Sequence, residues 1–284
     1  MFSMAIITSA LELGFIYALV ALALYLSFRV LNIADMTTDG AFTLGCAVSA
    51  TVALAGHPYL ALPAAMLAGA CAGVVTALLQ TKWGVPSILA GIITNTGLYT
   101  VNLAVMGFSS NVNMLRAETI FTPFPGMKII PAVIVTVLVA TALVVFLSTR
   151  LGLSIRATGD NPDMVRASSI NTGLTITIGL AISNSITALS GAVLAQYQKT
   201  ADISLGTGMV IIGLASLIIG ETVFRRGKLW VKVLGAVVGC ILYRFIIALA
   251  LRLDLPSECL KLVSAVIVAV AIALPAIRKN KGGK

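Results

Sequence analysis

Polar side chains interrupt the apolar stretches of this sequence, and they are the groups best suited to handle a small solute. They occur in a segment after the first apolar stretch, in the fourth stretch and in the sixth. The candidates are Asp35, Thr37, Thr38, Asp39, Thr94, Asn95, Asn102, Asn184 and Thr187. The fourth and sixth stretches carry amides and hydroxyls without charge, which argues against a proton relay. The pattern indicates a path for a small polar or zwitterionic molecule.

Each of these groups has a second interpretation that involves structure alone. The segment 29–40 could be irregular backbone lining a wet cavity, or a plain turn in which Asp39 caps the next helix. Asn95 and Asn102 are seven residues apart and share a helix face, where they could line a pore or bond to a neighbouring helix. The sequence leaves these alternatives open.

A polar island at 149–172 separates two apolar stretches and contains a short helix signal. Asp160 or Asn161 can cap this helix, Pro162 suits its first position, and Asp163 complements the helix dipole. A short amphipathic helix at the aqueous side of a membrane bundle is a surface that a soluble motor protein can bind.

Enzyme chemistry has no visible place in the sequence. It lacks a Gly-x-x-x-x-Gly-Lys-Ser/Thr phosphate loop, a His-Glu-x-x-His zinc pair and a Gly-x-Ser-x-Gly elbow. The spacing of Cys46, Cys71, Cys240 and Cys259 fits neither a disulfide framework nor a zinc site. We therefore expect a protein that is not an enzyme and holds no metal or cofactor of its own.

Composition places the chain in a membrane. Of its 284 residues, 59% are hydrophobic and 10% are charged, and its mean hydropathy is +1.05. A soluble domain carries about 25% charged residues. The net charge of +9 comes from basic residues at the ends of apolar stretches, so it does not indicate nucleic-acid binding.

The elements that must position the polar groups are membrane-spanning helices, each about 20 residues long. We expect about nine, two of them short, forming a single all-α transmembrane domain over 1–284. The expected spans are 5–28, 41–56, 59–79, 86–107, 129–148, 173–194, 208–224, 229–251 and 261–277.

Basic residues predict the orientation, because cytoplasmic loops are enriched in lysine and arginine. The C-terminal tail, the turn at 225–228, the island and Lys82 should be cytoplasmic, and the N-terminus and loops 108–128 and 252–260 should face outward. Arg244 lies within a span, where it could extend outward or pair with an acid.

Two weak repeats predict an inverted duplication. Ala-Asp at 34–35 recurs at 201–202, 167 residues later, and each pair precedes a short span. The pair Gly69 and Gly73 recurs as Gly235 and Gly239, at a spacing of 166. Five spans lie between the Ala-Asp pairs, which places them on opposite sides of the membrane, as in inverted-repeat transporters. Each glycine pair could form a dimer seam or pack helices within one chain.

These residues resemble the permeases of ABC importers in the branched-chain amino acid/ribose group. The resemblance rests on the run 17–24, on Leu31-Asn-Ile-Ala-Asp35 before a helix of small residues that begins at Gly40, on the island 156–171 and on the glycine pattern 206–220. It covers about 12 to 225, and the chain looks closest to a branch paired with lipoprotein-type binding proteins for aromatic amino acids.

The resemblance implies a division of labour. An extracytoplasmic binding protein delivers the solute, two copies of the chain form the pathway in a bacterial inner membrane, and a separate ATPase binds ATP and Mg. The ATPase would dock on a coupling helix formed by Asp160, Asn161, Pro162, Asp163, Met164, Val165, Arg166 and Ala167. Membrane lipid is the remaining expected partner, and we expect no nucleic-acid partner.

A secondary transporter with inverted repeats, driven by Na⁺ or H⁺, is the alternative. It would need an ion site built from acids at mid-membrane, for which Asp35 and Asp202 are the candidates. The capped helix in the island has no purpose under that alternative.

Overall fold

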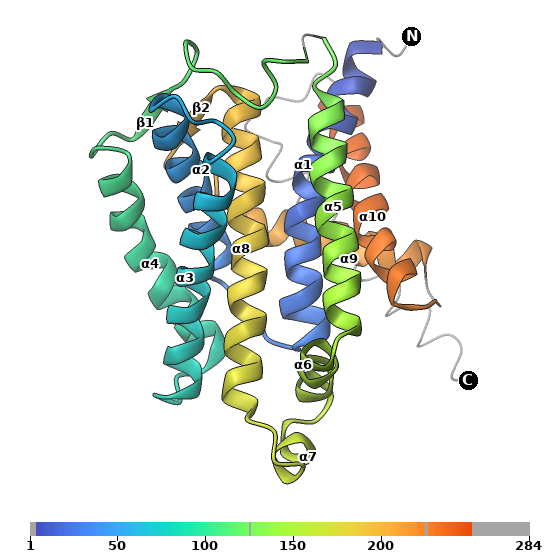
Figure 1. The fold of residues 1–284 in the computed structure, drawn as a ribbon. Helices are drawn as coiled ribbons and strands as arrows, with labels where there is room; N and C mark the ends of the chain where they lie inside the picture. Colours follow the sequence, from blue (N-terminus) through green and yellow to red (C-terminus); the bar gives the residue numbers. More distant parts are fainter. Residues whose placement is uncertain (1–3, 125, 225–226, 252–284) are drawn as a thin grey trace.

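The computed structural model describes residues 4–124, 126–224 and 227–251, and these form a bundle of helices with one pair of very short strands (Figure 1). The elements, in chain order, are α1 Met4–Leu24, the π-helix η1 Tyr25–Val30, α2 Thr38–Leu54, α3 Ala61–Thr81, α4 Ser87–Val105, β1 Asn111–Asn113, α5 Ile129–Ser148, α6 Arg150–Asp160, α7 Pro162–Ala167, α8 Thr172–Gln198, β2 Thr200–Asp202, α9 Met209–Val223 and α10 Leu229–Leu251. The predicted all-α membrane bundle is confirmed.

Six of these helices are long and apolar enough to cross a membrane, with α1 and η1 forming one span. The two spans predicted to be short are α2, with 17 residues, and α9, with 15. At about 1.5 Å per residue, neither reaches across a hydrocarbon core about 30 Å thick. The predicted span 261–277 lies outside the described residues.

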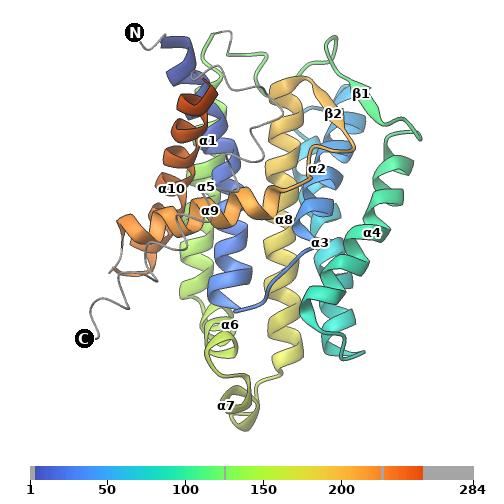
Figure 2. The same ribbon diagram turned by 180° about the vertical axis from the view of Figure 1, so that it is seen from behind.

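The short helices enter the bundle from opposite ends (Figure 2). From the lower end of α1, the chain rises through residues 31–37 to the start of α2. From the upper end of α8, it descends through residues 203–208 to the start of α9. The two units thus run in opposite directions, in agreement with an inverted repeat.

The two Ala-Asp pairs form the same turn, which supports their equivalence. Asp35 Oδ1 accepts a hydrogen bond from the Thr37 amide at 2.8 Å, and Asp202 Oδ1 accepts one from the Ser204 amide at 2.8 Å. An aspartate that bonds to the backbone two residues on is a self-contained turn. Their surroundings differ, because Asp35 is buried and Asp202 is partly exposed.

The glycine pairs pack helices within this chain. A Cβ at Gly69 or Gly73 would collide with a backbone carbonyl of α8, and a Cβ at Gly239 would collide with the Ser216 carbonyl of α9. Small residues let membrane helices approach this closely. Of the two alternatives for these glycines, the structure selects packing within one chain.

The centre of the bundle is formed by α1 and α8. Two serines of α8 join the helices, since Ser190 Oγ donates to the Ile16 carbonyl at 2.7 Å and Ser183 Oγ donates to the Ala23 carbonyl at 2.8 Å. Ala23 lies two residues before the first residue of the π-helix. A π-helical turn changes the register of backbone bonds and is frequent at functional sites.

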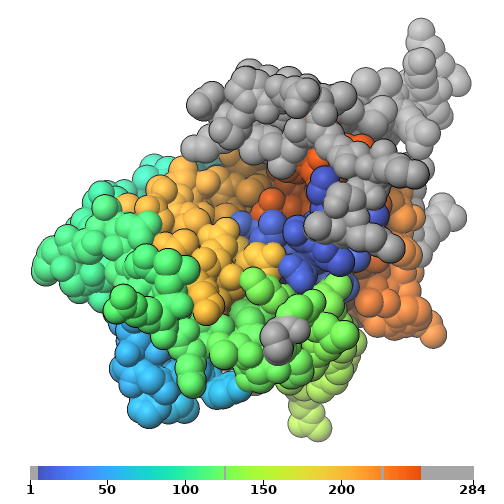
Figure 3. Space-filling view, turned by 90° about the horizontal axis from the view of Figure 1, so that it is seen from above, coloured from blue at the N-terminus to red at the C-terminus, as the bar shows by residue number. Residues whose placement is uncertain are grey.

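At one end of the bundle, the connection between α4 and α5, shown in green in Figure 3, lies over part of the surface. Within it, β1 pairs antiparallel with β2, so that Asn111 lies opposite Asp202. Asn111 Nδ2 donates to Asp202 Oδ2 at 3.2 Å. This connection was expected to be a loop, and the strand pair ties it to the segment that leads into α9.

Arg244 of α10 meets an aromatic ring. Its guanidinium carbon lies 3.8 Å from the centroid of the Tyr17 ring, and no acidic side chain of the described residues forms an ion pair with it. A cation over an aromatic face is stabilised by the ring quadrupole. Instead of extending outward or pairing with an acid, as expected, Arg244 contacts the ring of Tyr17 of α1.

Candidate transport site and coupling surface

The short helix α7 forms the tip of the molecule at the end away from β1 and β2 (Figures 1 and 2). Asn161 is its cap, because Asn161 Oδ1 accepts hydrogen bonds from the amides of Asp163 and Met164, each at 3.1 Å. Pro162 occupies its first turn, as predicted. Asp160, the other candidate cap, is the last residue of α6.

The predicted coupling residues form one exposed surface with a buried anchor. All of them are exposed except Val165, which packs inward with 2% of its surface accessible. Met164 is 61% exposed, although its side chain is apolar. Arg166 bonds within the island, through its Nε to Thr172 Oγ1 at 3.0 Å and to Asp163 at 3.4 Å.

Helix α6, which the sequence did not distinguish from the rest of the island, connects α7 to the bundle. Gly159 packs against the Val30 carbonyl at the end of η1, so closely that a Cβ would not fit. Thr158 and Thr175 share a hydrogen bond of 2.9 Å between their hydroxyls, which joins α6 to α8. A displacement of α7 would therefore be transmitted to both central helices, α1 and α8.

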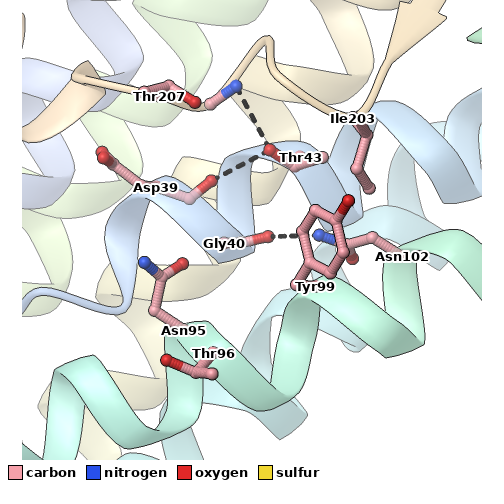
Figure 4. Close-up of a pocket in the computed structure, with 10 residues that line it drawn as sticks. Asp39, Gly40, Thr43, Asn95, Thr96, Tyr99, Asn102, Ile203 and Thr207 are labelled. Carbon is pink, nitrogen blue, oxygen red and sulfur yellow. Dashed lines mark hydrogen bonds between the residues drawn. The ribbon is translucent and has the colours of Figure 1, made fainter. Parts of the chain in front are cut away.

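A polar pocket of about 340 Å³ lies at the start of α2 (Figure 4). Three segments far apart in the sequence line it: α2, α4 and the descending segment between β2 and α9. Its lining residues are Asp39, Gly40, Thr43, Asn95, Thr96, Tyr99, Asn102, Ile203, Gly206 and Thr207. It is thus a hydrogen-bonding cavity between the spanning helix α4, the short helix α2 and the segment that leads into α9.

Asp39 joins the two short helices at this pocket. It lies in the first turn of α2, and its carboxylate accepts hydrogen bonds from the amides of Gly208 at 2.9 Å and Val210 at 3.0 Å. These amides begin α9, so a side chain of one short helix caps the other. The positive ends of two helix dipoles therefore meet beside one carboxylate.

Thr43 and Gly206 hold the descending segment against α2. Thr43 Oγ1 donates to the Asp39 carbonyl at 3.1 Å and accepts from the Gly206 amide at 3.2 Å. Gly206 lies directly on the Asp39 carbonyl, where no side chain fits. This contact requires glycine, and it brings the segment to the rim of the pocket.

Asn102 is fixed by one hydrogen bond and leaves an acceptor free. Its Nδ2 donates to the Gly40 carbonyl at 3.2 Å, as Figure 4 shows. Only 2% of the residue is exposed, and its Oδ1 has no hydrogen-bond partner within the described part of the chain. A buried acceptor without a partner is energetically costly, so Asn102 Oδ1 is, among the described residues, an unsatisfied polar atom in the lining of the pocket.

The candidate pathway residues do not form one set. Asp39, Asn95 and Asn102 line the pocket. The others bond elsewhere in the bundle and are buried: Asp35, Thr37, Thr38, Thr94, Asn184 and Thr187.

A buried polar network accounts for most of this second group. Asn184 Nδ2 donates to Asp35 Oδ2 at 2.7 Å, and the hydroxyls of Thr37 and Thr76 lie 2.8 Å apart. Thr38 donates to the Asp35 carbonyl at 3.2 Å. These contacts hold residues 31–37 against α3 and α8, and Thr94 and Thr187 bond to carbonyls of their own helices at 3.0 Å and 3.1 Å.

Sequence reasoning missed several residues of the pocket. Tyr99 could have been found, because it lies between Asn95 and Asn102 on the same helix face. Thr43, Gly206 and Thr207 carry no comparable signal, since only the contact between α2 and the descending segment brings them to the pocket.

A membrane bundle with a polar pocket among its spans and an exposed helix at one end has the organisation of a transport permease. The chain belongs to the family described as the branched-chain amino acid transport system / permease component, whose sequence model matches residues 6–274. It is accordingly the permease of an ABC importer, a multi-pass membrane protein that handles a solute of the amino acid or sugar type.

Curated relatives cover most of the chain. It is 33% identical over 271 residues to a tyrosine transport system permease protein of Clostridioides difficile (strain R20291), across 94% of this chain and 90% of the relative. It is 29% identical over 275 residues to the uncharacterized protein RP368 of Rickettsia prowazekii, across 95% and 98%. It is 23% identical over 246 residues to the ribose import permease protein RbsC of Haemophilus influenzae, across 84% and 75%. No solved structure matches it significantly.

Proposed function

We propose that the chain imports an amino acid, aromatic or branched-chain, and that a separate ATPase drives it through α7. The observation that carries this proposal is α7 itself: a capped helix at the tip, with an exposed apolar Met164 and a rigid connection to α1 and α8 through α6. The similarity to a tyrosine transport permease favours an amino acid over a sugar. ATP and Mg are bound by the ATPase.

The arrangement of charges supports an orientation with α7 in the cytoplasm. Arg150, Arg156 and Arg166 lie in α6 and α7, and Lys82 ends α3 at the same end of the bundle (Figure 1). Because cytoplasmic ends of membrane helices are rich in basic residues, β1 and β2 then face outward. This outer end would receive the solute from a binding protein, and the N-terminus would lie there too.

A second copy of the chain would complete the pathway. Thr96 and Tyr99 of α4 are exposed beside the pocket. Exposed polar groups within a membrane span are unfavourable in lipid and are normally covered by protein or water. Two ATPase subunits also require two permease chains, so a homodimer fits both requirements.

The rival secondary transporter gains no support from the two aspartates it would need. Asp35 is buried and bonded to Asn184, whereas Asp202 lies at the strand pair and bonds to Asn111. They belong to separate sites in the described residues, so they do not combine into one ion site. The buried Asp35 has structural partners from α2 and α8.

Co-purification tests the proposed role of α7. Met164→Asp places a charge on the exposed apolar contact without removing any hydrogen bond of its side chain, and we expect it to abolish co-purification of the ATPase. Lys82→Gln, at the same end of the bundle but on α3, is the control and should retain the ATPase. Retention by Met164→Asp, or solute accumulation by the purified chain with Na⁺ or H⁺ alone, would refute the proposal.

A further inference from the structure

The pocket at the start of α2 offers hydrogen-bond acceptors and a negative charge. We propose that it binds the ammonium group of the solute, through Asp39, Asn102 Oδ1 and the ring of Tyr99. The solute is then an amine or an amino acid, and a neutral sugar is a poor ligand. This inference rests on the proposed transport function, because it assigns a chemical class to the solute at that site.

Asp39 supplies the charge and keeps acceptor capacity. Each of its oxygens accepts one backbone amide of α9, whereas an ionised carboxylate has about four acceptor positions. Among the described residues that line the pocket, none is a lysine or an arginine. The charge is compensated by backbone dipoles rather than by a tethered cation, so a solute ammonium has no side chain to displace.

Asn102 supplies a second acceptor in a fixed direction. Its bond to the Gly40 carbonyl sets which way the amide points, because only the NH₂ group can donate to a carbonyl. Oδ1 is thereby left as the unpartnered atom in a buried residue that lines the cavity. A donor from the solute would satisfy it, and an ammonium group carries three donors.

Three side-chain donors at the pocket are committed to the backbone. Asn102 Nδ2, Thr43 Oγ1 and Thr96 Oγ1 all donate to backbone carbonyls. A sugar hydroxyl both donates and accepts, whereas an ammonium only donates and also attracts an aromatic face. Tyr99, 55% exposed at the pocket, offers that face.

Binding to the full chain in lipid nanodiscs tests the inference with four probes that separate the chemical groups. They are L-tyrosine, tyramine without the carboxylate, 3-(4-hydroxyphenyl)propionate without the ammonium, and D-ribose. We expect L-tyrosine and tyramine to bind, and the other two to bind more weakly by a factor of about 100 or more, as expected for a lost charged contact. Equal binding of the propionate, preference for ribose, or no binding of any probe would overturn the inference.

Variants locate the binding to this pocket. Asp39→Asn keeps the size of the side chain and removes its charge, and it should weaken tyramine binding by a factor of about 10 or more. Asp202→Asn is the control, because it removes the charge of an aspartate that does not line the pocket, so binding should be unchanged. An unchanged Asp39→Asn affinity would refute the assignment.

A second variant avoids any damage to the cap of α9. The Thr207 side chain is exposed and makes no hydrogen bond within the described residues. Thr207→Lys adds a tethered ammonium to the pocket and should compete with tyramine, whereas Thr207→Gln, of similar length, measures the steric contribution alone. Equal losses from both variants would contradict a site for a cation.

The outcomes separate this inference from the proposed function. Suppose that D-ribose or 3-(4-hydroxyphenyl)propionate binds as well as L-tyrosine, while Met164→Asp still abolishes co-purification of the ATPase. Only the assignment of the pocket to an ammonium group then fails. If tyramine binds at Asp39 but no ATPase associates with the wild-type chain, only the proposed function fails.

Discussion

Gly159 of α6 lies directly against the backbone carbonyl of Val30, the last residue of the π-helix η1. Helix α6, which supports α7, thus packs where α1 and η1 end and the segment leading into α2 begins. Two stretches far apart in the sequence are joined here by backbone contact, with no long side chain between them. Contact of this kind transmits displacement well, because backbone cannot deform as a flexible side chain can.

Enlarging Gly159 should separate these elements. A Cβ would meet the Val30 carbonyl, so Gly159→Val should cost about 1–3 kcal/mol of stability, the usual range for overpacking. It should also reduce the ATPase stimulation that accompanies transport. Thermal unfolding and ATPase assays measure the two effects. Gly97→Ala in α4, where a Cβ meets nothing within 4 Å, is the control and should change neither quantity appreciably.

Removing the cap of α7 should loosen the coupling surface. Asn161→Ala deletes the acceptor for two backbone amides and should cost about 0.5–2 kcal/mol of local stability. Hydrogen exchange at Asp163 and Met164 should therefore become faster. Asn161→Asp retains an acceptor and should preserve slow exchange. Unchanged exchange in Asn161→Ala would show that tertiary contacts such as that of Val165 hold α7 without the cap.

An ion pair joins η1 to α9, and it should contribute modestly to stability. Arg29 donates to both carboxylate oxygens of Glu221, and the two side chains are 49% and 33% exposed. Pairs this accessible contribute about 0.2–1 kcal/mol. A double-mutant cycle with Arg29→Gln and Glu221→Gln should give a coupling energy in that range, and a value near zero would exclude a direct contribution.

The contact between β1 and β2 should weaken in acid. Hydrogen bonds from the Ser204 hydroxyl and amide lower the pKa of Asp202 below its usual value of 3.8. A carboxyl group with a lowered folded pKa stabilises the fold above its unfolded pKa, and this contribution is lost as the pH falls through the folded value. The protection of the amides of residues 111–113 from hydrogen exchange, relative to their intrinsic exchange rates at each pH, should fall below a pH of about 4, and Asp202→Asn should remove this dependence.

Local patterns of the sequence were enough to predict much of the fold. The apolar stretches gave the spans, and the lengths of 41–56 and 208–224 already distinguished the two helices too short to cross. The string Asn161-Pro162-Asp163 predicted a capped helix, because capping depends on residues within one turn. The spacing of Asn95 and Asn102 placed them on one face of α4, a relation fixed by helical periodicity.

Tertiary structure decided which polar residues act together. Asp39 and Asp35 looked alike in the sequence, yet Asp39 caps α9 at Gly208, 169 residues away, and Asp35 is buried against Asn184. No local pattern specifies such partners, since they depend on where the irregular segments 31–37 and 203–208 lie within the bundle. The sequence thus determined the apolar spans, the cap of α7 and the polar face of α4 through interactions within a few residues. The pocket, and the connection of α6 to η1, arose only when the packing of two inverted units brought distant backbone segments into contact.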